Sequence, residues 1–312
     1  MDKPTVSVWM ITYNHEKFIA QAIESILEQK TNFSFEFVIG EDFSNDNTAT
    51  IVKEYAKKYP EIIKARFNNP NLGIMSNVIK TLEECNGKYI ALCEGDDYWT
   101  DHYKLQKQVD FLEANPDVIM CYTDIEKLYK NGEKHIEKYQ EEMTFIEIIK
   151  GNLPATPTMM IRNDKSLIFF LEGYIDKFYG DRMITYWCIK NGRIKNLREV
   201  TAIYRIHDGG MWGRNNSYEI HQNTIKYLHE FHNIIGNPNN GLLTYLDLSG
   251  RFYFLYKSFC NKKINIKIIM NELGEIKNRN SVFQILIAIF KICVEKLCKL
   301  ISLGRIRYKF YQ

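Results

Sequence analysis

The first 124 residues alternate short apolar runs with amphipathic segments. Unbroken apolar runs are typical of strands buried on both faces, whereas apolar residues spaced three and four apart indicate helices with one buried face. The runs predict strands at residues 6–11, 35–40, 62–67, 89–93 and 118–123, and the spacing predicts helices at 16–29, 48–59, 73–85 and 104–114. This alternation predicts an α/β fold with a mostly parallel sheet and right-handed crossovers.

The rhythm changes after residue 124. The later sequence predicts a polar hairpin at 125–139, a short helix at 144–150, a proline-punctuated segment at 153–162, a helix at 181–190 and a strand at 200–206. From residue 217 onward the pattern becomes helical. We therefore divide the chain into residues 1–124, 125–215 and a helical region at 216–312.

An acidic turn follows the strand predicted at residues 89–93. Glu94, Asp96 and Asp97 supply three carboxylates within four residues, and Gly95 loosens the backbone between them. Like charges so close repel each other unless a cation lies among them, and divalent metals with oxygen preference suit such groups. The alternative is a solvated acidic loop, which short motifs of this kind often prove to be. The preceding strand favours a site, because ligands bind at the carboxyl ends of parallel strands.

Polar residues also follow the first two predicted strands. Thr12 ends the first strand and Asp42 follows the second, so both are expected at the same sheet edge as the acidic turn. A carboxylate only accepts hydrogen bonds, and Asp42 would suit a base that presents an N–H, as uracil or guanine does. The chain contains neither GxxxxGK[ST] nor GxGxxG, which disfavours a P-loop kinase or a dinucleotide enzyme. The remaining hypothesis is a site for a nucleotide diphosphate that is built from carboxylates and a metal ion.

Composition narrows the function classes further. The chain has 312 residues, 45% of them hydrophobic, and a net charge of +3 that is too small to argue for nucleic-acid binding. Seven cysteines without a CxxC pair predict reduced thiols in a cytoplasmic protein. The N-terminus lacks a basic-then-apolar leader, and no run of 18 uncharged apolar residues predicts a spanning helix.

Four segments together carry a family resemblance. VSVWMITYNHEKFIAQAIESILEQ, FVIGEDFSNDNT, NLGIMSN and GKYIALCEGDDYWT, in this order and spacing, resemble glycosyltransferase family 2 of the GT-A fold. The match is strong over residues 4–124 and continues more weakly to about 215. It implies a Rossmann-like, mostly parallel central sheet flanked by helices, with a nucleotide-sugar-binding half, an acceptor-binding half and a helical C-terminal extension. It also implies an inverting transferase that moves a sugar, most simply from a UDP-sugar, to a glycan or lipid-linked glycan.

The resemblance assigns roles on the donor side. It assigns binding of the nucleotide base to Asp42, binding of the ribose to Asp96, and binding of Mn²⁺ or Mg²⁺ to Asp97. Glu94 departs from the usual DxDD pattern, in which an aspartate stands first. Further donor-binding residues implied by the motifs are Thr12, Tyr13, Asn14 and Asn77.

The resemblance also assigns the later site residues. Gly180-Asp181 matches the acid at a helix start that serves as general base, although Asp181 is also suited to capping its helix and Asp176 is an alternative base. In YRIHDGGMW, Arg205 and His207 match groups that touch the diphosphate or the metal, and a structural histidine is the alternative. The remaining candidates, all on the acceptor side, are Thr156, Thr158, Trp99, Trp187 and Trp212.

The C-terminal region carries one further pattern. The spacing of apolar residues predicts an amphipathic helix with a wide apolar face at 280–303, followed by Arg305, Arg307 and Lys309. Such a helix suits packing against the domain, contact with a second subunit in a homodimer, or peripheral attachment to the inner face of the cell membrane. Our prediction is a transferase of surface polysaccharide synthesis, such as capsule or lipopolysaccharide. The alternative is a GT-A-like protein that binds nucleotide or glycan without turnover.

Overall fold

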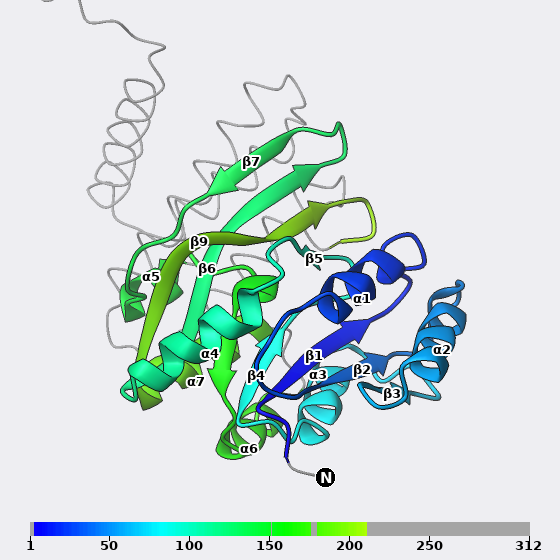
Figure 1. The fold of residues 1–312 in the computed structure, drawn as a ribbon, viewed down its shortest axis with the longest axis horizontal. Coiled ribbons are helices and arrows are strands. Elements are labelled where there is room, and N and C mark those ends of the chain that lie inside the picture. Colours follow the sequence, from blue (N-terminus) through cyan, green and yellow to red (C-terminus); the bar gives the residue numbers. More distant parts are fainter. Residues whose placement is uncertain (1–2, 151, 176–179, 211–312) are drawn as a thin grey trace, which may run out of the picture. The chain divides into compact units, whose positions relative to one another are not determined.

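A computed structural model describes residues 3–150, 152–175 and 180–210 of the chain (Figure 1). The chain divides into two compact units, Met1–Gly213 and Arg214–Gln312, and only the first contains described residues. The predictions for Asp176, Trp212 and the helix at 280–303 lie outside the described residues. Among the described helices, none has the length and apolar character needed to cross a membrane.

The first half of the unit follows the predicted alternation closely. Its strands are β1 (Val6–Thr12), β2 (Phe35–Glu41), β3 (Ile63–Phe67) and β4 (Tyr89–Leu92), and its helices are α1 (Ile19–Leu27), α2 (Thr48–Lys58), α3 (Ile74–Glu83) and α4 (Lys104–Ala114). The four strands are parallel in the order β3-β2-β1-β4. This arrangement confirms the predicted α/β fold class.

The second half extends the same sheet with mixed strand directions. Its elements are β5 (Tyr98–Trp99), β6 (Val118–Tyr129), β7 (Lys134–Glu137), α5 (Phe145–Lys150), the 3-10 turn η1 (Thr156–Thr158), β8 (Met160–Arg162), α6 (Ser166–Glu172), α7 (Gly180–Asn191) and β9 (Arg193–Ile206). The order is β3-β2-β1-β4-β8-β6-β9-β5, and β7 pairs with β6. β8 is antiparallel to both β4 and β6 and so joins the two halves. The sequence did not predict β5 or α6, and β9 begins seven residues before the strand predicted at 200–206.

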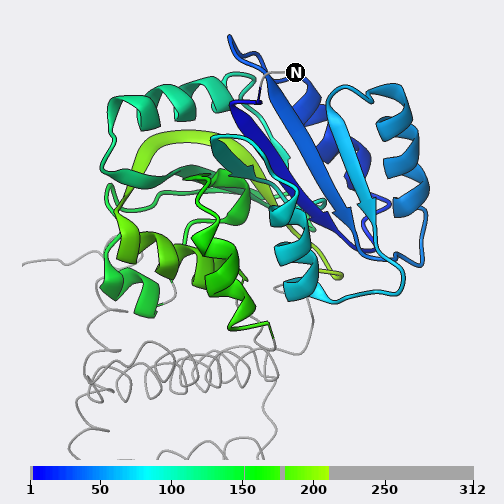
Figure 2. The ribbon, with the colours of Figure 1, turned by 90° about the horizontal axis from the view of Figure 1, so that it is seen from below.

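Helices cover both faces of the sheet. α4 lies on one side, and α6 and α7 lie on the other (Figure 2). Alternate side chains of β1 serve the two faces, since Val8 joins the core cluster that includes α1, whereas the indole nitrogen of Trp9 lies 3.4 Å from the Val78 carbonyl oxygen of α3. Burial on both faces explains why β1 is an unbroken apolar run.

The topology brings the carboxyl ends of three strands to one edge. Thr12 of β1 pairs with Glu41 of β2, so Asp42 follows beside it, and the amide of Asp42 donates to the Thr12 carbonyl at 3.1 Å. β4 runs parallel to β1 on its other side, so the acidic turn after Leu92 reaches the same edge. β9 pairs with β5 and carries Arg205 toward this turn.

Candidate active site

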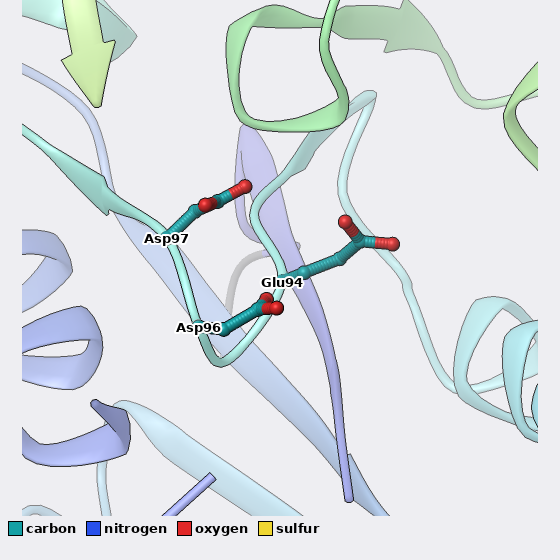
Figure 3. Close-up of side chains that lie close together, drawn as sticks. All are labelled: Glu94, Asp96 and Asp97. Atoms are coloured by element: carbon teal, nitrogen blue, oxygen red, sulfur yellow. The ribbon is translucent and has the colours of Figure 1, made fainter. Parts of the chain in front are cut away.

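The acidic turn between β4 and β5 gathers three carboxylates. One carboxylate oxygen each from Glu94, Asp96 and Asp97 can be chosen so that all three lie within 4.8 Å of one another, and the three side chains project toward one side of the turn (Figure 3). Gly95 lets the turn pass close to β1, because a Cβ atom there would lie 2.5 Å from Thr12 Oγ1. The glycine is therefore required by the close approach of the two chain segments.

Asp97 is the most deeply buried of the three acids, with 1% of its surface exposed. Its Oδ1 accepts a 2.9 Å hydrogen bond from the Arg205 amide, whereas its Oδ2 has no hydrogen-bond partner among the described residues. Burial, together with the charges of Asp96 and Glu94, raises the pKa of Asp97 well above its usual range. A buried, unpartnered oxygen beside two further carboxylates fits a hard divalent cation such as Mg²⁺ or Mn²⁺.

Asp96 lies between two histidines. Its Oδ2 is 3.0 Å from Nε2 of His207 and 3.6 Å from Nε2 of His15. Burial alone would raise the pKa of Asp96, but the hydrogen bond with His207 and the nearby His15 bring it below its usual range. The carboxylate is thus held in its charged form. Because His207 contacts Asp96, the structure places His207 beside the acids.

Glu94 connects the acidic turn to the later part of the chain. Burial, followed by the charges of Asp96 and Asp181, raises its pKa to about 8, and a hydrogen bond with the Thr156 side chain acts in the opposite direction. The influence of Asp181 places the start of α7 near the acidic turn. Asp181 itself is exposed, and its Oδ1 accepts a 2.7 Å hydrogen bond from the Arg182 amide. An exposed acid here is accessible to an acceptor.

Asp42 is buried at the end of β2, and its carboxylate organises the loop before α3. Oδ1 accepts hydrogen bonds from Asn68 Nδ2 and from the Leu72 amide, both at 2.9 Å. Oδ2 accepts one bond, from the Gly73 amide at 3.0 Å. Since each carboxylate oxygen has two acceptor positions, one position remains on Oδ2 within these contacts.

The loop after β1 is joined to the loop after β2. Asn14 donates its amide to Ser44 Oγ at 2.9 Å, and its Oδ1 accepts the amide of Asn45 at 2.8 Å. Asn45 also donates to the Tyr13 hydroxyl at 3.3 Å. Tyr13 is 42% exposed, so its ring is available to a ligand, and Thr12 is buried with its hydroxyl 3.2 Å from Nδ1 of His15.

The structure corrects the expected role of Asn77. This residue is buried on α3, where its Nδ2 donates to the Gly40 carbonyl at 2.9 Å and its Oδ1 accepts from Asn68 at 3.0 Å. Both ends of the amide are occupied inside the protein. Asn77 therefore orients Asn68, which in turn binds Asp42, and does not face the nucleotide.

The guanidinium group of Arg205 contacts the acidic turn. It donates to the Asp96 carbonyl at 2.5 Å and to Gln21 Oε1, and it stacks 4.3 Å from the centre of the Tyr98 ring. Together with the hydrogen bond from the Arg205 backbone amide to Asp97, these contacts hold the turn against α1 and β9. In the structure, Arg205 thus holds the acidic turn in place.

Of the four acceptor-side candidates among the described residues, two are placed differently from the prediction. Trp99 is 4% exposed and donates its indole N–H to the Pro157 carbonyl at 2.9 Å. Thr158 is fully buried and donates its hydroxyl to the Ala155 carbonyl at 2.6 Å. Neither offers a surface to a sugar, whereas Thr156 is half-buried and reaches Glu94. Trp187 is buried as well, in agreement with packing.

Sequence reasoning missed three polar residues that support the site. Gln21 lies on an amphipathic helix where a glutamine gives no functional signal, yet it binds Arg205. Lys104 and Gln108 occur four residues apart at the start of α4, a spacing typical of a solvated helix surface, but both are fully buried. Only the register of α4 against the sheet reveals them.

The family model described as "Glycosyl transferase family 2" matches residues 7–169. An uncharacterized protein of Mycobacterium tuberculosis is 32% identical over 216 residues, which is 66% of this chain but only 60% of that protein's length. An uncharacterized glycosyltransferase of Methanocaldococcus jannaschii is 35% identical over 66% of this chain and 72% of its own length.

Solved structures show the same fold. TarS of S. aureus, residues 1–349 in complex with UDP-GlcNAc, superposes with a TM-score of 0.60 at 20% identity, over 87% of this chain and 80% of that one. The mannosyltransferase PcManGT of Pyrobaculum calidifontis, in complex with GDP-Man and Mn²⁺, gives a TM-score of 0.57 at 15% identity, over 98% and 82%. The family model spans more than half of the chain, and the chain therefore belongs to glycosyl transferase family 2.

Proposed function

We propose that the protein is an inverting glycosyltransferase that moves a sugar from a UDP-sugar to a hydroxyl group of a glycan or lipid-linked glycan. The observation that carries the proposal is the unpartnered, buried Oδ2 of Asp97 among Glu94 and Asp96, at the sheet edge that also holds Asp42. The nucleotide sugars bound by TarS and PcManGT support the donor class. The acceptor, a surface polysaccharide such as capsule or lipopolysaccharide, follows from the family resemblance.

Asp97, with Asp96 and Glu94 beside it, would hold the metal. Three carboxylates give an oxygen donor set that suits Mn²⁺ or Mg²⁺, and the Mn²⁺ in the PcManGT complex supports this choice. A divalent cation bound there would supply positive charge for the departing diphosphate. The chain's own contribution is to hold the carboxylates ready, through the Arg205 amide on Asp97 and His207 on Asp96.

Asp42 supports uracil as the base. With three acceptor positions of its carboxylate occupied by the chain, one position on Oδ2 is left for a ligand. Uracil and thymine present a single imide N–H to such an acceptor. Guanine presents a ring N–H and an amino N–H side by side and needs two acceptors. The exposed ring of Tyr13 lies on the neighbouring loop, where it would stack on a base.

Asp181 would act as the general base. It is exposed in the first turn of α7, and its charge influences Glu94 of the acidic turn, so it stands at the border between the donor and acceptor sides. Inverting transfer needs one base that takes the proton of the acceptor hydroxyl as that oxygen attacks the sugar. The attack displaces the nucleoside diphosphate in a single step, and no covalent enzyme intermediate forms.

A donor panel tests this function. The unfolding temperature of the full chain would be measured with UDP-, dTDP- and GDP-sugars, each with and without Mn²⁺. We expect stabilisation by UDP-sugars that requires Mn²⁺ and that disappears in Asp97→Asn. Hydrolysis of the stabilising donor is then measured as the release of UDP. This measurement distinguishes an enzyme from a protein that binds without turnover. Stabilisation by GDP-sugars alone would contradict the assignment of Asp42.

A further inference from the structure

Lys104 is a fully buried lysine at the start of α4, outside the acidic turn. It is 0% exposed, and no carboxylate of the described residues forms an ion pair with it. Burial lowers its pKa from 10.5 to about 8. An ammonium group in the protein interior is costly unless its hydrogen bonds are satisfied, so its presence calls for a reason beyond filling space.

Two side chains contact the ammonium group of Lys104, and both also contact the turn at residues 155–158. Its Nζ lies 2.5 Å from Gln108 Oε1 and 4.4 Å from the centre of the Trp99 ring. Gln108 donates its Nε2 to the Thr158 carbonyl at 2.9 Å, and Trp99 donates its indole N–H to the Pro157 carbonyl at 2.9 Å. An amide whose oxygen is fixed by a cation must direct its NH₂ group the other way. Lys104 therefore sets the orientation in which Gln108 can hold the turn.

The turn at residues 155–158 is bonded at every carbonyl. The Ala155 carbonyl accepts from Thr158 and the Thr156 carbonyl accepts from the Met159 amide at 3.1 Å, which leaves the next two carbonyls to Trp99 and Gln108. The Ala155 amide donates to the Tyr139 hydroxyl at 3.1 Å. This fixed turn is bonded to the strand that leads into the acids, because the Met159 carbonyl accepts the Leu92 amide at 3.0 Å. The Thr156 side chain acts on Glu94 from this turn and lowers the pKa of that carboxyl.

We propose that Lys104 is a positioning residue that acts through Gln108 and Trp99 to fix the turn at 155–158, and thereby places Thr156 and Glu94 at the edge of the active site. The hydrogen bonds of this chain run from Lys104 through Gln108 to the turn, and from the turn to Leu92 just before the acids. Its catalytic consequence rests on the proposed function, whereas its effect on the turn does not.

Two substitutions break this chain at different points. Lys104→Met keeps an unbranched side chain of similar length in the apolar site but removes the donor that orients Gln108. Gln108→Glu keeps an acceptor for Lys104 but removes the donor to the Thr158 carbonyl. Lys107→Met is a matched control on the same helix, because Lys107 pairs with Asp101 and Glu199 at the surface.

Amide hydrogen exchange and donor hydrolysis test the proposal together. In the full-length protein we expect peptides covering 155–159 to exchange about tenfold faster in Lys104→Met and Gln108→Glu, because one strong hydrogen bond to the turn typically contributes such a factor. Peptides of β1 and β2 should exchange no faster than in the unmodified protein, and all peptides of Lys107→Met should be unchanged. Donor hydrolysis should fall about tenfold in both variants.

Each other outcome is decisive. Unchanged exchange at 155–159 in both variants overturns the proposal, and so does faster exchange there with normal hydrolysis. Faster exchange throughout the protein with a lower unfolding midpoint would show that Lys104 supports the whole fold and not this turn. If the unmodified protein hydrolyses no nucleotide sugar, the proposed function fails, and the exchange data still decide whether Lys104 holds the turn.

Discussion

Replacing Lys104 by methionine removes a buried ammonium group, and its pKa gives the size of the expected effect on stability. Burial lowers the pKa of Lys104 from 10.5 to about 8 in the folded protein. At about 1.4 kcal/mol for each tenfold change in proton affinity, this interval corresponds to about 3 kcal/mol. Below pH 8 the lysine is charged in both the folded and the unfolded chain, so the folded protein bears the whole cost.

The sign of the pH dependence follows from the order of the two pKa values. Between about pH 8 and pH 10.5 the unfolded chain binds a proton at Lys104 that the folded chain does not bind, so the free energy of unfolding rises with pH. Methionine has no such dependence. We therefore expect Lys104→Met to be the more stable protein at pH 7, and its advantage to shrink by about 3 kcal/mol as the pH approaches 10.5.

Urea unfolding of both proteins at pH 7, 8, 9 and 10 measures this difference. Other groups titrate in the same range, but they are common to both proteins and cancel in the comparison. Lys107→Met is the control, since hydrogen bonds with Asp101 and Glu199 raise the pKa of Lys107 above its ordinary value and give it no alkaline gain in stability. Parallel stability curves for Lys104→Met and the unmodified protein would refute the reasoning.

Three further predictions concern the acidic turn and the base. Asp97→Asn should fold normally but lose Mn²⁺-dependent UDP binding in calorimetry, because only the full carboxylate charge compensates the metal; equal affinity would contradict the assignment. Asp181→Asn should lower turnover by about 10²- to 10⁴-fold with donor affinity unchanged, and if Asp176→Asn alone has this effect the base is Asp176. Arg205→Lys should weaken Mn²⁺-dependent UDP binding about tenfold, because a lysine cannot reach the Asp96 carbonyl and Gln21 together, and full affinity would refute its clamping role.

The fold was predictable from the sequence where the hydrophobic residues follow a single clear pattern, either a continuous apolar run or a helical spacing. The strands of the first half are continuous apolar runs because helices bury both faces, and their predicted bounds lie within one residue of the structure. The start of β9 was missed because its first residues, RIKNLREV, alternate weakly and pair with β6 along a partly exposed part of the sheet. α6 was missed because SLIFFLE is too short and too apolar to show a helical period.

The site was predictable only to the level of the strand ends. The sequence placed Asp42, Asp97 and Thr12 at one edge, because parallel strands share their carboxyl ends. It could not tell which polar groups face a ligand and which are consumed inside the protein. Asn77 and Arg205 carry the right chemistry for donor contact, yet their hydrogen bonds go to Gly40 and to the acidic turn. Such partners are set by tertiary packing, which a sequence pattern does not reveal.

The short strand β8 has a mechanical consequence. It joins β4 on one side and β6 on the other, and Arg162 at its end donates to the carbonyls of Val118, Leu112 and Asn115. The four parallel strands and the later strands are therefore parts of one continuous sheet, and a hinge between them would have to break this ladder. Movement at the candidate site must then be carried by the loops at the sheet edge, while the sheet itself forms a rigid frame behind them.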